Sequence, residues 1–111
     1  MCAARAYALT NRNYVRGRAR EYRAKATLFK MGALYVHRSY GSHGVFDLVA
    51  VFRREVRLIQ VKRDYIPKWE LKRLKDFARQ VAAPNIFVEL WQYPNRRRMI
   101  TRLNAPAATG S

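Results

Sequence analysis

Two runs of β-forming residues joined by a very short connection constrain the fold of this chain most strongly. The runs cover about 45–53 and 55–63, are rich in branched apolar side chains, and are separated by Arg53-Arg54-Glu55. A connection this short joins antiparallel neighbours, because parallel strands need a crossover of a dozen or more residues. The two runs therefore predict an antiparallel β-hairpin.

A helix is predicted before the hairpin, from about Arg16 to Met31. This segment contains good helix formers, and Tyr22, Ala26 and Phe29 recur at helical spacing to give an apolar stripe. Gly32 follows the last periodic residue, as expected for the left-handed C′ position that ends many helices.

The remaining segments predict three more strands and a second helix. Strands are expected at about 34–38, 85–93 and 98–103, and a helix is expected to start at Pro67 and to run to about Val81. The order α-β-β-β-α-β-β predicts a small α/β domain, with a central mixed five-stranded sheet flanked by helices.

One domain accounts for the length of the chain. A chain of 111 residues can bury about two-thirds of its unfolded surface, which is enough for a core without disulfides or zinc. We expect residues 15–103 to form this domain, after a flexible basic arm at 1–14 and before a disordered tail at 104–111.

The charge of the chain predicts a polyanionic partner. Twenty-three basic residues face seven acidic ones, for a formal net charge of +16, and binding to phosphates relieves the self-repulsion. Nucleic acid is favoured over a membrane, because the longest apolar runs are typical of strands rather than of an amphipathic helix. No small-molecule substrate is expected.

Cysteine usage and the first residues predict an intracellular protein. Cys2 is the only cysteine, so no internal disulfide and no cysteine-based zinc site can form. Arg5 interrupts the short apolar start, and no signal peptide or membrane span is predicted. We therefore expect a cytoplasmic, nucleoid-associated location.

Asp47 is the acidic residue whose position most needs an explanation, because it stands between apolar β-formers in a strongly basic chain. In the predicted hairpin, Asp47 and Lys62 fall near the same end, while Gln60 and Lys62 are two residues apart and share a face. Glu21 adjoins the apolar stripe of the first helix and should lean toward the sheet. Binding a cation beside a phosphate is the simplest explanation for an aspartate at position 47.

Three of these residues also have a purely structural interpretation. Glu21 could pair with Lys25 or Arg18 along its own helix. Asp47 could accept hydrogen bonds from backbone amides at the start of a strand. Lys62 could protect an edge strand from pairing with another chain.

The combined pattern resembles a known enzyme superfamily. A helix glutamate (Glu21), an Arg-Ser-x-Gly-Ser loop at 38–42, an aspartate entering a strand (Asp47) and the run Gln60-Val61-Lys62 resemble the PD-(D/E)XK nucleases. The spacing is similar to that of the archaeal-type Holliday junction resolvases, which also occur in phages. The resemblance covers roughly residues 14–82, and weakly the last two strands.

The resemblance implies a restriction-endonuclease-like core and a homodimeric endodeoxyribonuclease that resolves four-way DNA junctions by symmetric paired nicks. Its cofactor would be Mg²⁺, with Mn²⁺ as an alternative, and a phage-encoded protein would act in the host cytoplasm. The implied catalytic residues are Glu21, Asp47, Gln60 and Lys62. The implied metal ligands are Glu21, Asp47, Gln60 and the backbone carbonyl of Val61. Gln60 stands where the family usually carries a carboxylate, so the site has one negative charge fewer.

The residues expected to contact DNA lie on both helices and on the loop before Asp47. They are Arg16, Arg18, Arg38, Ser39, Ser42, His43, Lys68, Lys72, Lys75 and Arg79. Two alternatives remain open: another PD-(D/E)XK nuclease acting on flaps or on nicked or mismatched duplex, and a catalytically decayed, basic DNA-binding module.

Overall fold

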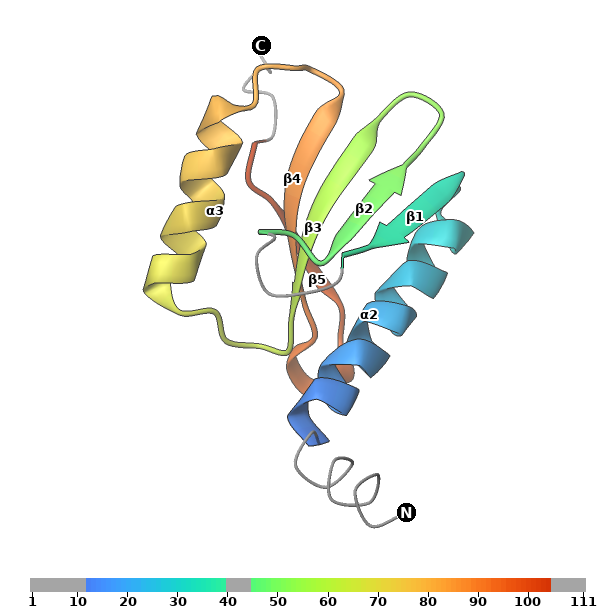
Figure 1. The fold of residues 1–111 in the computed structure, drawn as a ribbon, viewed down its shortest axis with the longest axis vertical. Coiled ribbons are helices and arrows are strands. Elements are labelled where there is room, and N and C mark those ends of the chain that lie inside the picture. Colours follow the sequence, from blue (N-terminus) through green and yellow to red (C-terminus); the bar gives the residue numbers. More distant parts are fainter. Residues whose placement is uncertain (1–11, 40–44, 105–111) are drawn as a thin grey trace.

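Five strands and two long helices make up the part of the chain that the computed structural model describes, residues 12–39 and 45–104 (Figure 1). In chain order these elements are α2 (Arg12–Lys30), β1 (Tyr35–Arg38), β2 (Leu48–Val51), β3 (Val56–Lys62), α3 (Lys68–Gln80), β4 (Ile86–Gln92), the short 3₁₀ helix η1 (Pro94–Arg96) and β5 (Met99–Arg102). The prediction of a small α/β domain with a five-stranded mixed sheet and two helices is confirmed. Residues 1–11 of the predicted arm and residues 105–111 of the predicted tail lie outside the described residues.

The strands form one mixed sheet in the order β1-β2-β3-β4-β5. The predicted hairpin is confirmed, because β2 and β3 pair antiparallel with Val51 opposite Val56 and Leu48 opposite Ile59. β1 and β5 also pair antiparallel with their neighbours, whereas β3 and β4 run parallel. The helix α3 supplies the crossover that a parallel pair requires. β3 is therefore an interior strand with a neighbour on each side.

Helix α2 differs from its prediction in two ways. It begins at Arg12 rather than at Arg16, so residues 12–14 of the predicted arm are helical, since no proline interrupts them. The predicted stripe is wrong: Tyr22 and Phe29 are 48% and 46% exposed, while Ala24 and Leu28 are fully buried. The exposed and the buried residues both recur at helical spacing, so spacing alone does not identify the buried face. The small side chain of Ala24 lets the helix lie close to the sheet.

Gly32 ends α2 as predicted. Its φ of +107° lies in the region that favours glycine. The Gly32 N–H donates to the Phe29 carbonyl at 3.1 Å, and the Ala33 N–H donates to the Leu28 carbonyl at 3.0 Å. This pair of bonds is the Schellman motif, which satisfies carbonyls that a helix end otherwise leaves unpaired.

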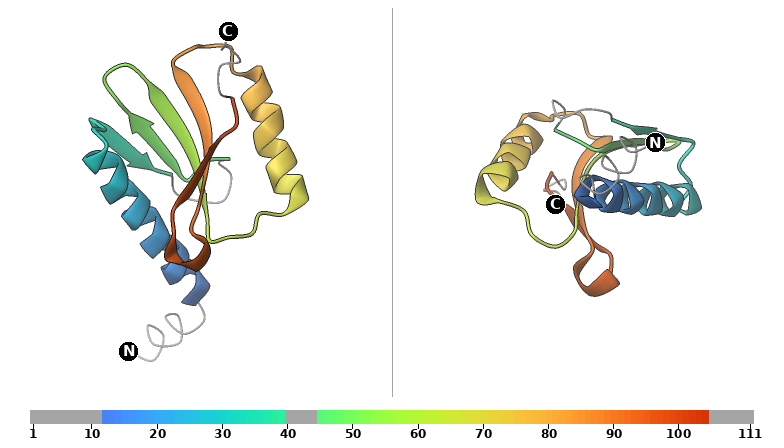
Figure 2. Two further views of the ribbon diagram at one scale, coloured as in Figure 1. Left: turned by 180° about the vertical axis from the view of Figure 1, so that it is seen from behind. Right: turned by 60° about the horizontal axis from the view of Figure 1, so that its bottom comes forward.

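The two helices cover opposite faces of the sheet (Figure 2). Ala24 and Leu28 of α2 pack in one core with side chains that include Leu48, Ile59 and Trp91. Successive strand residues point to opposite faces, so Gln60 and Lys62 lie on the other face, which is the face that α3 covers.

A buried glutamate stabilises the α2 side of the sheet. Glu89 on β4 is 1% exposed, accepts a hydrogen bond from Trp91 Nε1 at 2.9 Å, and pairs with Arg102 Nη2 at 2.8 Å. Arg57 Nη1 lies 3.8 Å from the same carboxylate. A buried charge needs such partners, because removing one of them leaves the charge poorly compensated.

We predict that Arg102→Ala lowers the free energy of unfolding by about 2–4 kcal/mol, measured by urea denaturation, because it removes the main partner of the buried Glu89 carboxylate. Arg79→Ala serves as the control, since the exposed Arg79–Asp76 pair should contribute under about 1 kcal/mol. Equal effects of the two substitutions would contradict this role for Glu89.

Candidate functional site

The candidate site is centred on Asp47, which immediately precedes β2. The Asp47 N–H donates to the Ile59 carbonyl at 2.9 Å, and its Oδ2 accepts a hydrogen bond from the Val61 N–H at 2.8 Å. Extending the β2–β3 register by one position places Asp47 opposite Gln60. The carboxylate therefore lies beside the last residues of β3, close to Glu21 of α2 and Glu70 of α3.

Three other charged side chains lie close enough to Asp47 to change its pKa. Burial raises the pKa of Asp47 to about 6, and the negative charges of Glu21 and Glu70 add to this increase. The hydrogen bond from Val61 and the positive charge of Lys62 act in the opposite direction. An acid in this environment ionises more readily when a further cation is nearby.

Glu21 leans toward the sheet, as predicted from the sequence. Its side chain is 17% exposed, and its Oε1 accepts a 2.6 Å hydrogen bond from Arg38 Nε at the end of β1. The partner of this ion pair is therefore a residue of the sheet rather than Lys25 or Arg18 on the same helix. The ion pair fixes the Glu21 carboxylate near the strand ends, where its charge acts on Asp47.

Lys62 reaches across to α3, where its Nζ lies 2.6 Å from Glu70 Oε2. The structural interpretation of Lys62 as an edge-strand guard is wrong, because β3 has neighbours on both sides. Sequence reasoning missed Glu70. An acidic residue in the first turn of a helix, where Glu70 lies, is favourable for the helix itself. However, Glu70 is only eight residues from Lys62 in the sequence, and this short distance could have identified it as a partner of Lys62.

The atoms near Asp47 that could bind a metal ion are oxygens, which suit a hard cation such as Mg²⁺. The Val61 carbonyl points to the same side of β3 as its N–H, toward Asp47, because a strand residue directs both groups to one side. Gln60, at 9% exposure, is nearly buried on the face shared with Lys62. Within residues 12–39 and 45–104, no group donates a hydrogen bond to the second carboxylate oxygen of Asp47, Oδ1.

The acidic residues do not form a ready-made metal cage. In the described part of the chain, no three His, Cys, Asp or Glu side chains are gathered closely enough to hold a metal ion. Glu21 and Glu70 each face a basic partner instead. Mg²⁺ is commonly bound through one or two carboxylates plus substrate phosphates, so the donor set fits a cation that binds together with a phosphodiester.

The predicted DNA contacts outside α3 fall into three groups. Arg16 and Arg18 are exposed on α2, although Arg18 Nη2 also donates to the Tyr22 hydroxyl at 3.1 Å. Arg38 is nearly buried in its pair with Glu21, and the Ser39 N–H donates to the Asp47 carbonyl. Ser42 and His43 lie outside the described residues.

The predicted basic stripe lies along one side of α3. A shallow pocket of about 280 Å³ there has all four stripe residues in its lining, Lys68, Lys72, Lys75 and Arg79. All four are exposed. Asp76 interrupts the stripe by pairing with Arg79, which lowers the local positive charge.

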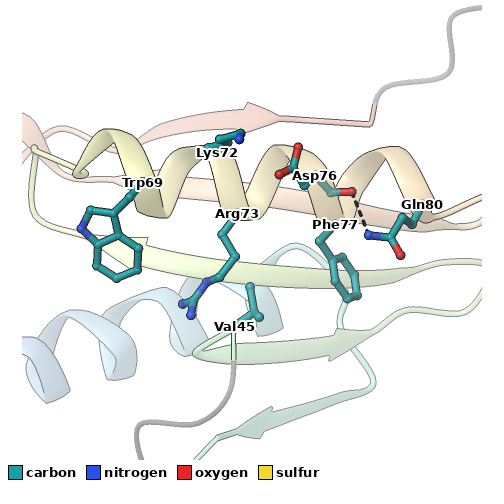
Figure 3. Close-up of a pocket in the computed structure, with 7 residues that line it drawn as sticks. All are labelled: Val45, Trp69, Lys72, Arg73, Asp76, Phe77 and Gln80. Carbon is teal, nitrogen blue, oxygen red and sulfur yellow. Dashed lines mark hydrogen bonds between the residues drawn. The ribbon is translucent and has the colours of Figure 1, made fainter.

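A second pocket, of about 340 Å³, lies between α3 and the residue Val45 (Figure 3). Trp69, Arg73 and Phe77 point into it from successive turns of the helix. Trp69 is 64% exposed, with the Arg73 guanidinium 5.6 Å from its ring centre. Because its lining contains a single carboxylate, that of Asp76, the pocket is a less suitable place for phosphodiester chemistry than the Asp47 site.

Comparison with known proteins assigns no family to the chain. No protein-family model matches it, and no curated protein matches it significantly. Among the described residues, no helix has the length and apolar character needed to cross a membrane.

The raised pKa of Asp47 predicts a pH-dependent stability difference in metal-free solution. The pKa is about 6 in the folded protein and about 4 in the unfolded chain, so the stabilisation is present below pH 4 and is lost as the pH rises through 6. Asp47→Asn keeps an acceptor for Val61 and should be more stable than the wild type at pH 8, by on the order of 1–2 kcal/mol after allowance for partial exposure. The two proteins should differ little at pH 4. Thermal unfolding in EDTA measures this, and a difference independent of pH would contradict it.

Proposed function

We propose that this protein is a divalent-metal-dependent endonuclease that resolves four-way DNA junctions. The observation that carries the proposal is the convergence on Asp47 of Glu21 from α2 and of Gln60, Val61 and Lys62 from β3, in a chain of net charge +16. These are the residues that the resemblance to the PD-(D/E)XK nucleases implies. The order α-β-β-β-α-β-β and the mixed sheet are consistent with the core that this resemblance implies.

The reaction is an in-line attack of water on a phosphodiester. One P–O bond forms on the attacking side, the opposite P–O bond breaks, and the leaving oxygen takes up a proton. A bound Mg²⁺ would neutralise the charge that grows on the phosphate oxygens and lower the pKa of its bound water. Glu21, Asp47, Gln60 and the Val61 carbonyl are the residues that would hold the ion.

Lys62 has two roles open to it. Its ammonium group can stabilise the charge of the five-coordinate phosphorus, or it can orient and help to deprotonate the attacking water. The 2.6 Å contact with Glu70 fixes Nζ at the end of β3, beside Asp47. Glu70 therefore acts as a positioning residue for Lys62 and adds negative charge to a site in which Gln60 supplies none.

The proposal includes a homodimer. Cutting a two-fold junction at paired positions requires two sites related by a two-fold axis, which an isologous dimer supplies. Specificity would be for the shape of the junction, because neither of the two helices in the described ranges carries the side-chain pattern of a helix that reads bases in the major groove.

A catalytically decayed DNA-binding module is the second candidate. The glutamine at position 60 and the lack of a three-residue acidic or histidine cluster in the described ranges favour it. Such a protein would bind junctions through its basic surface without cutting them. Chelator-sensitive cleavage separates the two candidates, and comparison of four-way, flap and linear substrates separates a junction resolvase from another nuclease of the superfamily.

We predict that Asp47→Asn lowers the rate of junction cleavage by roughly a hundredfold or more in Mg²⁺ or Mn²⁺. Junction affinity measured in EDTA should stay within about twofold, since the basic surface supplies the binding energy. Rates come from single-turnover assays on a labelled four-way junction, with Arg53→Ala as the control for a surface substitution. Turnover by the purified variant at the wild-type rate would place the chemistry elsewhere.

We predict that Gln60→Glu lowers the metal concentration that gives half-maximal cleavage, because it restores a negative charge beside Asp47. A titration of the rate against Mg²⁺ and Mn²⁺ measures this. Glu70→Gln is the matched comparison, since it removes a charge from the same region and should raise the metal requirement. A Gln60→Glu protein that needs as much metal as the wild type would show that position 60 does not face the ion.

A further inference from the structure

The structure contains a second basic site, of which the sequence analysis predicted only Arg16 as a DNA contact. A pocket of about 580 Å³ is lined by five arginines, Arg16, Arg20, Arg23, Arg63 and Arg96. They come from the first two-thirds of α2, from the residue after β3 and from η1, which meet at one end of the molecule (Figures 1 and 2). Residues far apart in sequence thus contribute to a single positive surface.

The charge of this pocket is largely uncompensated. Asp64 is the only acidic residue in its lining, so five positive charges face one negative charge. All seven acidic residues of the chain fall within the described ranges, and none of them forms an ion pair with any of the five arginines. Clustered like charges without partners destabilise a fold unless an anion binds there.

A buried hydroxyl provides an independent observation. Tyr93 lines the same pocket and is 7% exposed, and its hydroxyl has no hydrogen-bond partner among the described residues. The Arg23 guanidinium lies 5.9 Å from the centre of its ring. Buried polar groups without partners are rare in proteins, and a hydroxyl group beside several guanidinium groups is a suitable donor to a phosphate oxygen.

The position of the pocket indicates which phosphate it would bind. Arg63 directly follows Lys62, and Arg20 directly precedes Glu21, so the pocket adjoins the candidate site at the same end of β3. The Tyr93 N–H donates to the Arg63 carbonyl at 2.5 Å, which ties the loop after β4 to the end of β3. A nucleic-acid strand crossing the Asp47 site would continue past this pocket.

We propose that the five-arginine pocket with Tyr93 is a phosphate-binding site for the DNA backbone next to the strand that is cut. The proposal rests on the proposed function for the choice of DNA as the ligand. Its role is to hold the strand in register, because phosphate contacts position a nucleic acid without reading its sequence. The site also gives a function to basic residues outside α3, which contribute to the net charge of +16.

The test measures binding separately from cleavage. Affinity for a fluorescein-labelled four-way junction is followed by anisotropy in EDTA over a series of salt concentrations. The double variant Arg20→Ala/Arg63→Ala should bind roughly tenfold more weakly, and its log–log salt slope should be shallower by about 2. The control Arg53→Ala/Arg54→Ala removes the same charge at the far end of β3 and should change affinity by less than about twofold.

Tyr93→Phe tests the hydroxyl itself. It removes an unpartnered buried group, so stability should be unchanged or slightly higher, while junction affinity should fall severalfold. Unchanged affinity together with unchanged stability would remove Tyr93 from the site.

The outcomes distinguish this inference from the proposed function. Equal weakening by the two arginine double variants, or no weakening by either, would overturn the pocket as a phosphate site even if the wild type cuts junctions. If the wild type never cuts but the pocket variants alone lose affinity, the nuclease proposal fails and the pocket stands. Loss of binding to phosphatidylserine vesicles with unchanged DNA affinity would assign the pocket to a membrane and overturn the proposal.

Discussion

The 2.8 Å hydrogen bond from the Val61 N–H to Asp47 Oδ2 is the contact on which the candidate site depends. It links Asp47, the residue before β2, to the last residues of β3 and orients the carboxylate toward that strand end. Because α2 and α3 cover opposite faces of the sheet, this strand end is where side chains from both helices can approach. Glu21 arrives from one side, and the Lys62–Glu70 pair arrives from the other.

This arrangement places the Asp47 carboxylate where burial disfavours its ionised form. Desolvation is the main cause of the raised pKa of Asp47, and Glu21 and Glu70 add to it, while Lys62 offsets only part. Structural acids are usually paired directly, as Glu89 is with Arg102 in the core. Asp47 has an amide donor but no direct ion pair in the described ranges, which distinguishes it from the structural acid. A divalent cation held with a phosphate would complete its coordination, and the basic surfaces around it would supply that phosphate.

Much of the fold followed from local pattern. The hairpin, the mixed sheet and the Gly32 helix end could be predicted, because turn length, strand alternation and the left-handed glycine are local properties. The buried face of α2 could not, since Tyr22 and Leu28 both belong to stripes with helical period and only the shape of the sheet decides between them. The arginine pocket was missed for a related reason: its residues come together only when α2, the end of β3 and the segment after β4 are placed in space. Glu70 is different, because it lies only eight residues from Lys62 along the chain.

Paramagnetic mapping of a bound ion tests the central claim most directly. In an NMR titration of the DNA-free protein with small amounts of Mn²⁺, the amide signals of Asp47, Gln60 and Val61 should broaden first, and Asp47→Asn should abolish that broadening. Broadening centred on Glu55 and Glu89 instead, or broadening near β3 that survives in Asp47→Asn, would contradict a cation site built around Asp47.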